Sequence, residues 1–134
     1  MTDFNILRKR YSEVLCGRGH SGKRTADCIL RSDERTEQRL AQLDTRIEKA
    51  ITSNEPGIVN ATLKGILDIS TSFSQNNSRF YHDENIKNKI FNALNALEKV
   101  YNDTIAPQGN WWYWEIGIPL SLNSIFTLMY DYAD

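Results

Sequence analysis

Cysteine and histidine are scarce in this 134-residue sequence, and their scarcity excludes several kinds of site. Cys16 and Cys28 are the only cysteines, and they form neither a disulfide framework nor a C-x-x-C metal motif. Two free thiols are the expected state, with a single bridge as the alternative. The two histidines, His20 and His82, are too few to anchor a metal ion. We therefore expect no metal and no cofactor.

Long apolar runs are also missing, so no transmembrane helix is expected. The first residues lack the apolar core that a signal peptide carries. A net charge of −1 gives no reason to expect nucleic acid or a membrane surface as a partner. Basic side chains gather in residues 1–24, whereas residues 101–134 contain no lysine or arginine. The basic end could meet an acidic polymer, although such clusters are more often the solvated face of a helix.

No segment alternates apolar and polar residues, and the apolar residues recur instead at helical spacing. The length predicts one domain over residues 1–134. The pattern predicts an all-α fold of antiparallel helical hairpins, with helices near residues 4–16, 36–51, 59–73, 84–101 and 119–133. The second helix should begin between Asp33 and Thr36, with Ser32 or Asp33 as its cap. Asp83 should cap the fourth helix, and Pro119 should lie in the first turn of the last.

Residues 17–24 are predicted to form a basic, glycine-rich loop after the first helix. This loop nearly matches the phosphate-binding motif G-x-x-x-x-G-K-[ST]. The motif needs a hydroxyl after its lysine, but Arg24 stands there and Thr25 comes one place late. It also needs a preceding strand to aim its backbone N–H groups at the phosphates, and a helix is expected here. Nucleotide binding is therefore a weak alternative.

One stretch concentrates the aromatic residues. Residues 110–119 read Asn-Trp-Trp-Tyr-Trp-Glu-Ile-Gly-Ile-Pro and hold all three tryptophans of the protein. Four adjacent rings fit neither a one-sided helix nor an alternating strand, so we expect an aromatic loop or turn over residues 103–119. Such rings must point in several directions. Some should reach solvent or a ligand, and a core plug dense in rings is the competing interpretation.

The aromatic stretch resembles polysaccharide lyase family 8, which contains the hyaluronate, chondroitin AC and xanthan lyases. Two upstream blocks extend the resemblance. Residues 77–83, Asn-Ser-Arg-Phe-Tyr-His-Asp, are similar to the family's Ser-x-Tyr-Tyr-x-Asp turn, and residues 4–17 are similar to its first helix. The three blocks keep the order and spacing of the start of the family's catalytic α-domain. The resemblance therefore covers most of the chain.

The resemblance implies a partial α/α toroid and an anionic, uronic-acid-containing polysaccharide as substrate, cleaved by β-elimination in an extracellular or periplasmic setting. It implies that Asn110, Trp111 and Trp112 form an aromatic patch that positions the polymer. Trp114, at a more buried position, and Glu115, as a hydrogen-bonding partner, are expected to support that patch. A flat indole can cover the apolar C–H face of a sugar while a nearby amide meets its hydroxyl rim.

The same resemblance implies that the catalytic Asn, His, Tyr and Arg lie downstream of this sequence, so we expect no catalytic residue here and no activity from the chain alone. His20 and His82 match no catalytic position. Tyr113 stands where the family usually has Asp, and Leu120 where it usually has Arg. Apolar helix faces left without the next hairpin predict self-association. The alternative function is a non-catalytic helical module for carbohydrate binding or assembly.

Overall fold

The computed structural model describes residues 2–15, 23–102, 104–105 and 109–132. Its α-helices are α1 (Asp3–Leu15), α2 (Lys23–Ser53), α3 (Pro56–Ser74), α4 (Glu84–Leu97) and α5 (Ile118–Met129). A π-helical turn, η1 (Tyr113–Gly117), leads into α5, and a short 3-10 turn, η2 (Tyr130–Tyr132), follows it. The described residues contain no strand, so the all-α prediction is confirmed.

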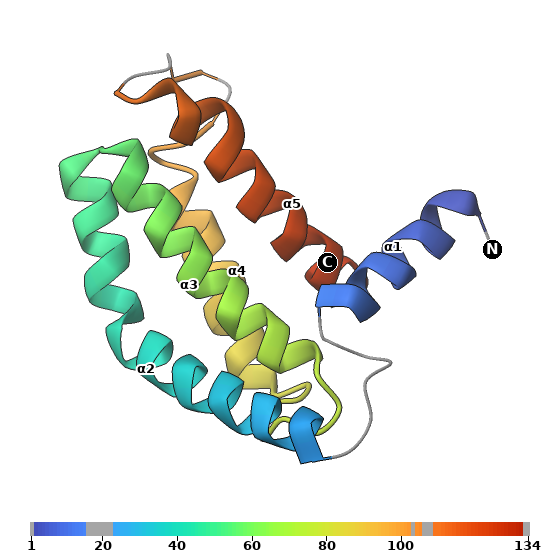
Figure 1. Cartoon of the computed structure of the whole chain (residues 1–134). Coiled ribbons are helices and arrows are strands. Elements are labelled where there is room, and N and C mark those ends of the chain that lie inside the picture. The colour runs from blue at the N-terminus through green and yellow to red at the C-terminus, as the bar shows by residue number, and fades with distance from the viewer. Residues whose placement is uncertain (1, 16–22, 103, 106–108, 133–134) are drawn as a thin grey trace.

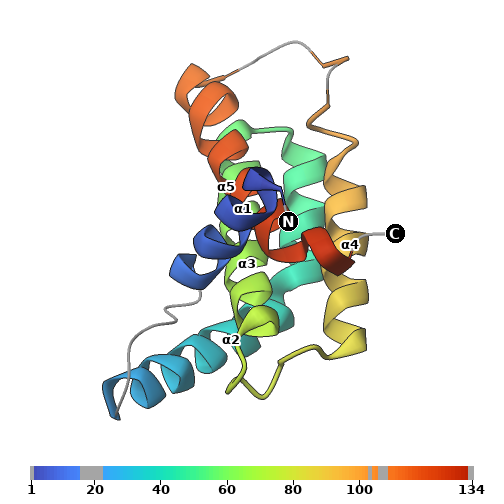
Figure 2. The same ribbon diagram turned by 90° about the vertical axis from the view of Figure 1, so that its right-hand side faces the viewer.

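Helix α3 lies at the centre of the fold. It packs against α2, α4 and α5, and Figures 1 and 2 show α2, α3 and α4 as successive antiparallel neighbours. Ile66 of α3, Ile90 of α4 and Ile125 of α5 are all fully buried in one core. Helix α1 packs against the last part of α5, where Tyr11 Oη lies 3.0 Å from Ser124 Oγ.

Two predicted helix starts are confirmed. The Asp83 side chain accepts the N–H groups of Asn85 at 2.9 Å and Ile86 at 3.4 Å, which satisfies two of the free donors at the start of α4. Pro119 lies in the first turn of α5, where its fixed φ suits a helix.

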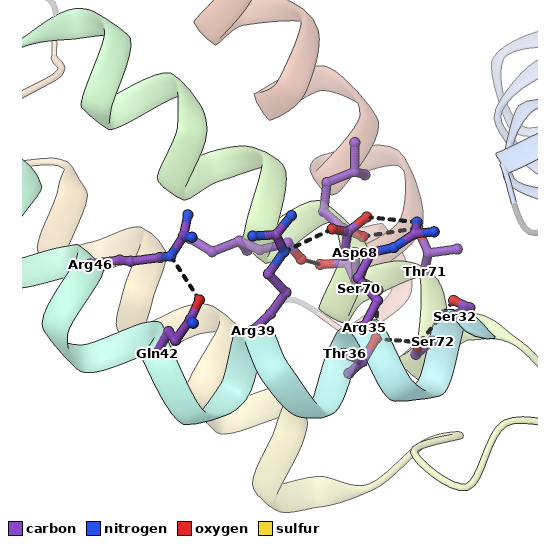
Figure 3. A network of polar contacts seen from close by, with 12 residues as sticks. Ser32, Arg35, Thr36, Arg39, Gln42, Arg46, Asp68, Ser70, Thr71 and Ser72 are labelled. Carbon is purple, nitrogen blue, oxygen red and sulfur yellow. Dashed lines mark hydrogen bonds and ion pairs between the residues drawn. The ribbon is translucent and has the colours of Figure 1, made fainter. Parts of the chain in front are cut away.

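The predicted start of the second helix is wrong, because α2 already begins at Lys23. The N-terminal half of α2 packs largely through polar side chains, and Ile29 is its one buried apolar residue among those whose burial the structure describes. Thr36 is fully buried, with Oγ1 2.6 Å from Ser72 Oγ, and Ser32 Oγ lies 3.3 Å from that same oxygen (Figure 3). The apolar period that reveals most helices is therefore missing from a stretch that is helical.

Asp33 has a different role from the expected helix cap. It is buried within α2, and its carboxylate accepts hydrogen bonds from the Ser78 hydroxyl and from the Arg79 backbone N–H. The carboxylate thus attaches the α3–α4 connection to the side of α2.

The loop or turn predicted over residues 103–119 is helical in its second part. Trp111 and Trp112 form a helical turn that widens into η1, where the Ile118 N–H bonds the carbonyl of Tyr113, five residues back. Pro119 has no N–H, so the carbonyl of Trp114 lacks a donor at the same spacing. The Tyr101 hydroxyl donates to that carbonyl at 2.9 Å.

An apolar groove of about 290 Å³ opens between α4 and α5. Phe91, Leu94, Leu122 and Phe126 line it, and Phe126 is exposed. This groove is an exposed apolar helix face of the expected kind, and self-association through it stays a prediction.

Several predictions fall on residues outside those that the structure describes, including Cys16, His20 and most of the basic loop at 17–24. Cys28 is an exposed free thiol. None of the described helices combines the length and apolarity that crossing a bilayer requires.

Replacing Asp33 with alanine should lower the free energy of unfolding by about 1–3 kcal/mol, because the buried Ser78 hydroxyl and the part-buried Arg79 N–H would lose their acceptor. Urea denaturation followed by circular dichroism measures the change. Asp44→Ala removes an exposed carboxylate from the same helix and should cost less than about 0.5 kcal/mol. Equal losses in the two variants would contradict the role of Asp33.

Replacing Tyr101 with phenylalanine should cost about 1 kcal/mol, because the Trp114 carbonyl would lose its donor. Desolvation by burial also raises the pKa of Tyr101 above its ordinary value of 10.0. The folded chain therefore holds the phenolic proton more tightly than the unfolded chain does. This stabilisation is complete below the ordinary pKa and is lost as the pH rises through the folded-state pKa.

The pH dependence is measured by urea denaturation at neutral and strongly alkaline pH. The wild type should lose more stability than Tyr101→Phe over this interval. An identical loss in both proteins would show that Tyr101 is not the responsible group.

Candidate functional site

Asn110 begins the turn that carries the tryptophans. Its Oδ1 accepts the Trp112 N–H at 2.9 Å, and its carbonyl oxygen lies 3.5 Å from the nitrogen of Trp114. Gly109, just before it, has a φ of +70°, and a Cβ there would lie 3.1 Å from Cδ of Pro56. Both the backbone conformation and the close approach require glycine. The entry to the aromatic turn is therefore fixed, with Asn110 itself exposed.

Trp111 and Trp112 are the two exposed indoles of this turn, with 61% and 41% of their surfaces accessible. The Trp112 ring lies against Gly117, where an added Cβ would stand only 2.7 Å from its Cζ3. It also meets the Tyr113 ring edge to face, with centroids 5.4 Å apart. Trp112 is thus held by its neighbours while part of its ring reaches solvent.

Tyr113 and Trp114 turn the other way. A Cβ on Gly57, at the start of α3, would lie 3.4 Å from Cε2 of Tyr113, so this ring covers the helix end. Trp114 is only 8% exposed and packs on Tyr101 with ring centroids 4.8 Å apart. The core position expected for Trp114 is confirmed. Two rings anchor the turn, and two are presented to solvent.

Glu115 is exposed, and its side chain makes no hydrogen bond or ion pair with any other described residue. The structure therefore offers no contact for the hydrogen-bonding role predicted for it. The residues that do support the patch, Gly117, Tyr101 and Asn60, were not identified from the sequence. Asn60 is buried beside Gly117, and its Oδ1 has no hydrogen-bond partner among the described residues. The sequence did contain one signal of irregular hydrogen bonding near this turn: Pro119, which has no N–H, lies five residues after Trp114.

The rest of the described structure offers no competing catalytic constellation near this turn. No group of three His, Cys, Asp or Glu among the described residues could hold a metal ion. His82 is exposed, stacks on Tyr81 at 3.8 Å and has Nε2 2.6 Å from Tyr132 Oη. Its connection, α3 to α4, lies at the opposite end of the helices from the aromatic turn (Figures 1 and 2). The aromatic turn suits binding of a ligand with apolar faces and hydroxyl groups.

Comparisons with known proteins cover nearly the whole chain. The sequence model of polysaccharide lyase family 8, N-terminal α-helical domain, matches residues 26–134. A xanthan lyase of Bacillus sp. (strain GL1) is 29% identical over 140 residues, which span 96% of this chain and 15% of that protein. A solved structure of Paenibacillus xanthan lyase matches with a TM-score of 0.70 at 20% identity, over 98% of this chain and 14% of that one.

The structural match confirms the predicted fold of antiparallel helical hairpins that form part of an α/α toroid. This chain spans about 15% of the length of the xanthan lyase relative. The region matched by the family model includes both the aromatic turn and the α3–α4 connection, two of the three blocks whose sequences resemble the family. The chain therefore belongs to polysaccharide lyase family 8 and matches its N-terminal α-helical domain.

Proposed function

We propose that this chain is the substrate-positioning part of a lyase that cleaves an anionic, uronic-acid-containing polysaccharide, and that Asn110, Trp111 and Trp112 bind the polymer. The observation that carries the proposal is the pair of exposed indoles on the helical turn that leads into the π-helical turn η1. The relatives are named as xanthan lyases, which supports a polysaccharide as the ligand. We further propose that the lyase works outside the cytoplasm, in keeping with the resemblance.

The indoles are suited to sugars because each presents a flat apolar face. A sugar ring has an apolar C–H face and a polar rim, so stacking removes apolar surface on both partners from water while the rim stays solvated. Asn110 lies exposed beside the rings, and its amide can meet hydroxyl groups at that rim. Trp112, pinned by Gly117 and Tyr113, loses little freedom on binding.

The elimination itself is assigned to residues outside this domain. A base removes the proton on C5 of the uronic acid, the charge that develops at its carboxylate is stabilised, and an acid protonates the leaving oxygen on C4. The described residues place no acid–base pair beside the indoles. The role of this chain is then to fix where the polymer lies, which lowers the entropic cost of reaching a reactive geometry.

Replacing Trp111 or Trp112 with alanine should weaken binding of uronic-acid-containing oligosaccharides about tenfold, the effect of losing roughly 1.4 kcal/mol of stacking. Isothermal titration calorimetry with xanthan-derived and hyaluronan oligosaccharides measures the change. Phe126→Ala removes an exposed ring elsewhere on α5 and should leave affinity unchanged. Unaltered affinity in both tryptophan variants would contradict the proposal.

A second experiment tests whether this chain binds the polymer without cleaving it. Incubating the chain with the same polymers should yield no rise in the ultraviolet absorbance of unsaturated uronic acid, although the polymers bind. Turnover by this chain alone would show that it carries catalytic groups. Absence of both binding and turnover would leave a purely structural role.

A further inference from the structure

The charged side chains of α2 are separated onto two faces of the helix. Four basic residues recur at intervals of four, seven and three, which places them on one stripe: Arg35, Arg39, Arg46 and Lys49. Acidic residues occupy another stripe of the same helix: Glu34, Glu37, Asp44 and Glu48. Helix α2 therefore presents a continuous positive edge about 21 Å long, at 1.5 Å per residue.

This edge borders two separate hollows, one beside α3 and α5 and the other beside α3 alone. Near its start, Arg35 and Arg39 line a hollow of about 490 Å³ together with Lys64 of α3 and Leu120 of α5. Further along α2, Arg46 and Lys49 line a second hollow against Gly57 and Ala61 of α3. Figure 3 shows Arg35, Arg39 and Arg46 projecting from one side of α2 toward α3. The basic stripe, Arg35, Arg39, Arg46 and Lys49 with Lys64, thus borders both hollows.

One carboxylate neutralises only part of the charge of the basic stripe. Asp68 is the one acidic residue among those that line the two hollows; its carboxylate lies 3.2 Å from Arg39 Nε and 3.8 Å from Arg35 Nη1. Arg46 donates through Nε to Oε1 of Gln42 at 3.2 Å, an acceptor that carries no charge. Lys49 and Lys64 are exposed and form no ion pair with a described residue.

The basic stripe also leads to the aromatic turn. Gly57 lines the second hollow beside Lys49, and the Tyr113 ring packs against Gly57 from the other side. Trp112 directly precedes Tyr113 in the chain. Figure 1 shows the end of α2, the start of α3 and the aromatic segment gathered at the same end of the molecule. An extended ligand on the two exposed indoles can therefore continue along α2.

We infer that the basic stripe binds carboxylate groups of the polysaccharide strand that stacks on Trp111 and Trp112, an inference that rests on the proposed function. Spaced single cations on an exposed edge suit a polymer with regularly repeated carboxylates. Single-stranded nucleic acid would instead call for aromatic side chains interleaved with the cations. The residues that line the two hollows include no aromatic side chain. The basic stripe thus extends the binding surface of the aromatic patch by attracting the carboxylates of the same polymer.

The test compares two triple variants of equal charge change. Arg46→Gln/Lys49→Gln/Lys64→Gln removes three cations of the stripe. The control is Lys9→Gln/Lys89→Gln/Lys99→Gln. It removes three exposed lysines, one in α1, one in α4 and one just after α4. Binding of a neutral cello-oligosaccharide and of a hyaluronan oligosaccharide is measured by calorimetry at low and at high salt.

The stripe variant should bind hyaluronan oligosaccharide about tenfold more weakly than wild type at low salt, with a shallower salt dependence. Its affinity for the neutral oligosaccharide should be unchanged, and the control should match wild type with both ligands. Hyaluronan affinity equal to that of the control would overturn the inference, and so would tighter binding of single-stranded DNA than of hyaluronan at equal charge. The double variant Trp111→Ala/Trp112→Ala separates the two proposals, because it should lose affinity for both sugars. If its affinity for both sugars stayed unchanged, the proposed function would be overturned.

Discussion

The carbonyl of Trp114 is the constraint on which the functional end of this domain depends. The Ile118 N–H bonds Tyr113, five residues back, rather than Trp114, and Pro119 has no N–H to donate, so Tyr101 supplies the missing hydrogen bond. The wider turn distributes four consecutive rings in different directions. Trp114 is drawn against Tyr101 in the core, and Trp111 and Trp112 face solvent. The widened turn thus divides the four rings between core and solvent more evenly than a regular helix would.

The sequence predicted the helices wherever packing is apolar and failed where packing is polar. Helices α3, α4 and α5 follow their apolar period, and the cap at Asp83 was recognisable from residue type alone. The start of α2 was not, because Thr36 and Ser32 meet Ser72 through hydroxyls and leave no apolar period to read. At the site, the exposed pair of indoles was predicted from the family resemblance. The contact between Trp112 and Gly117 depends on the widened turn, and Asn60 beside Gly117 comes from α3, so the sequence pattern revealed neither.

We propose that the aromatic turn and the basic stripe recognise one polymer through two different physical effects. Stacking on indoles is short-ranged and insensitive to salt, so it fixes the register of a sugar ring. Cations along α2 act over several ångströms and are screened by salt, so they orient the strand and favour carboxylated polymers. Both surfaces are built on helices that pack against α3 or continue into α5. On our proposal, this arrangement would let the helical domain position the polymer.

The most direct measurement is the ¹H–¹⁵N spectrum of the three indole N–H groups during titration with an oligosaccharide that contains uronic acid. Each resonance is assigned by substituting the corresponding tryptophan. The account predicts that the signals of Trp111 and Trp112 shift progressively and saturate together, while the signal of buried Trp114 stays in place. Saturating ligand that leaves Trp111 and Trp112 unshifted would contradict the account.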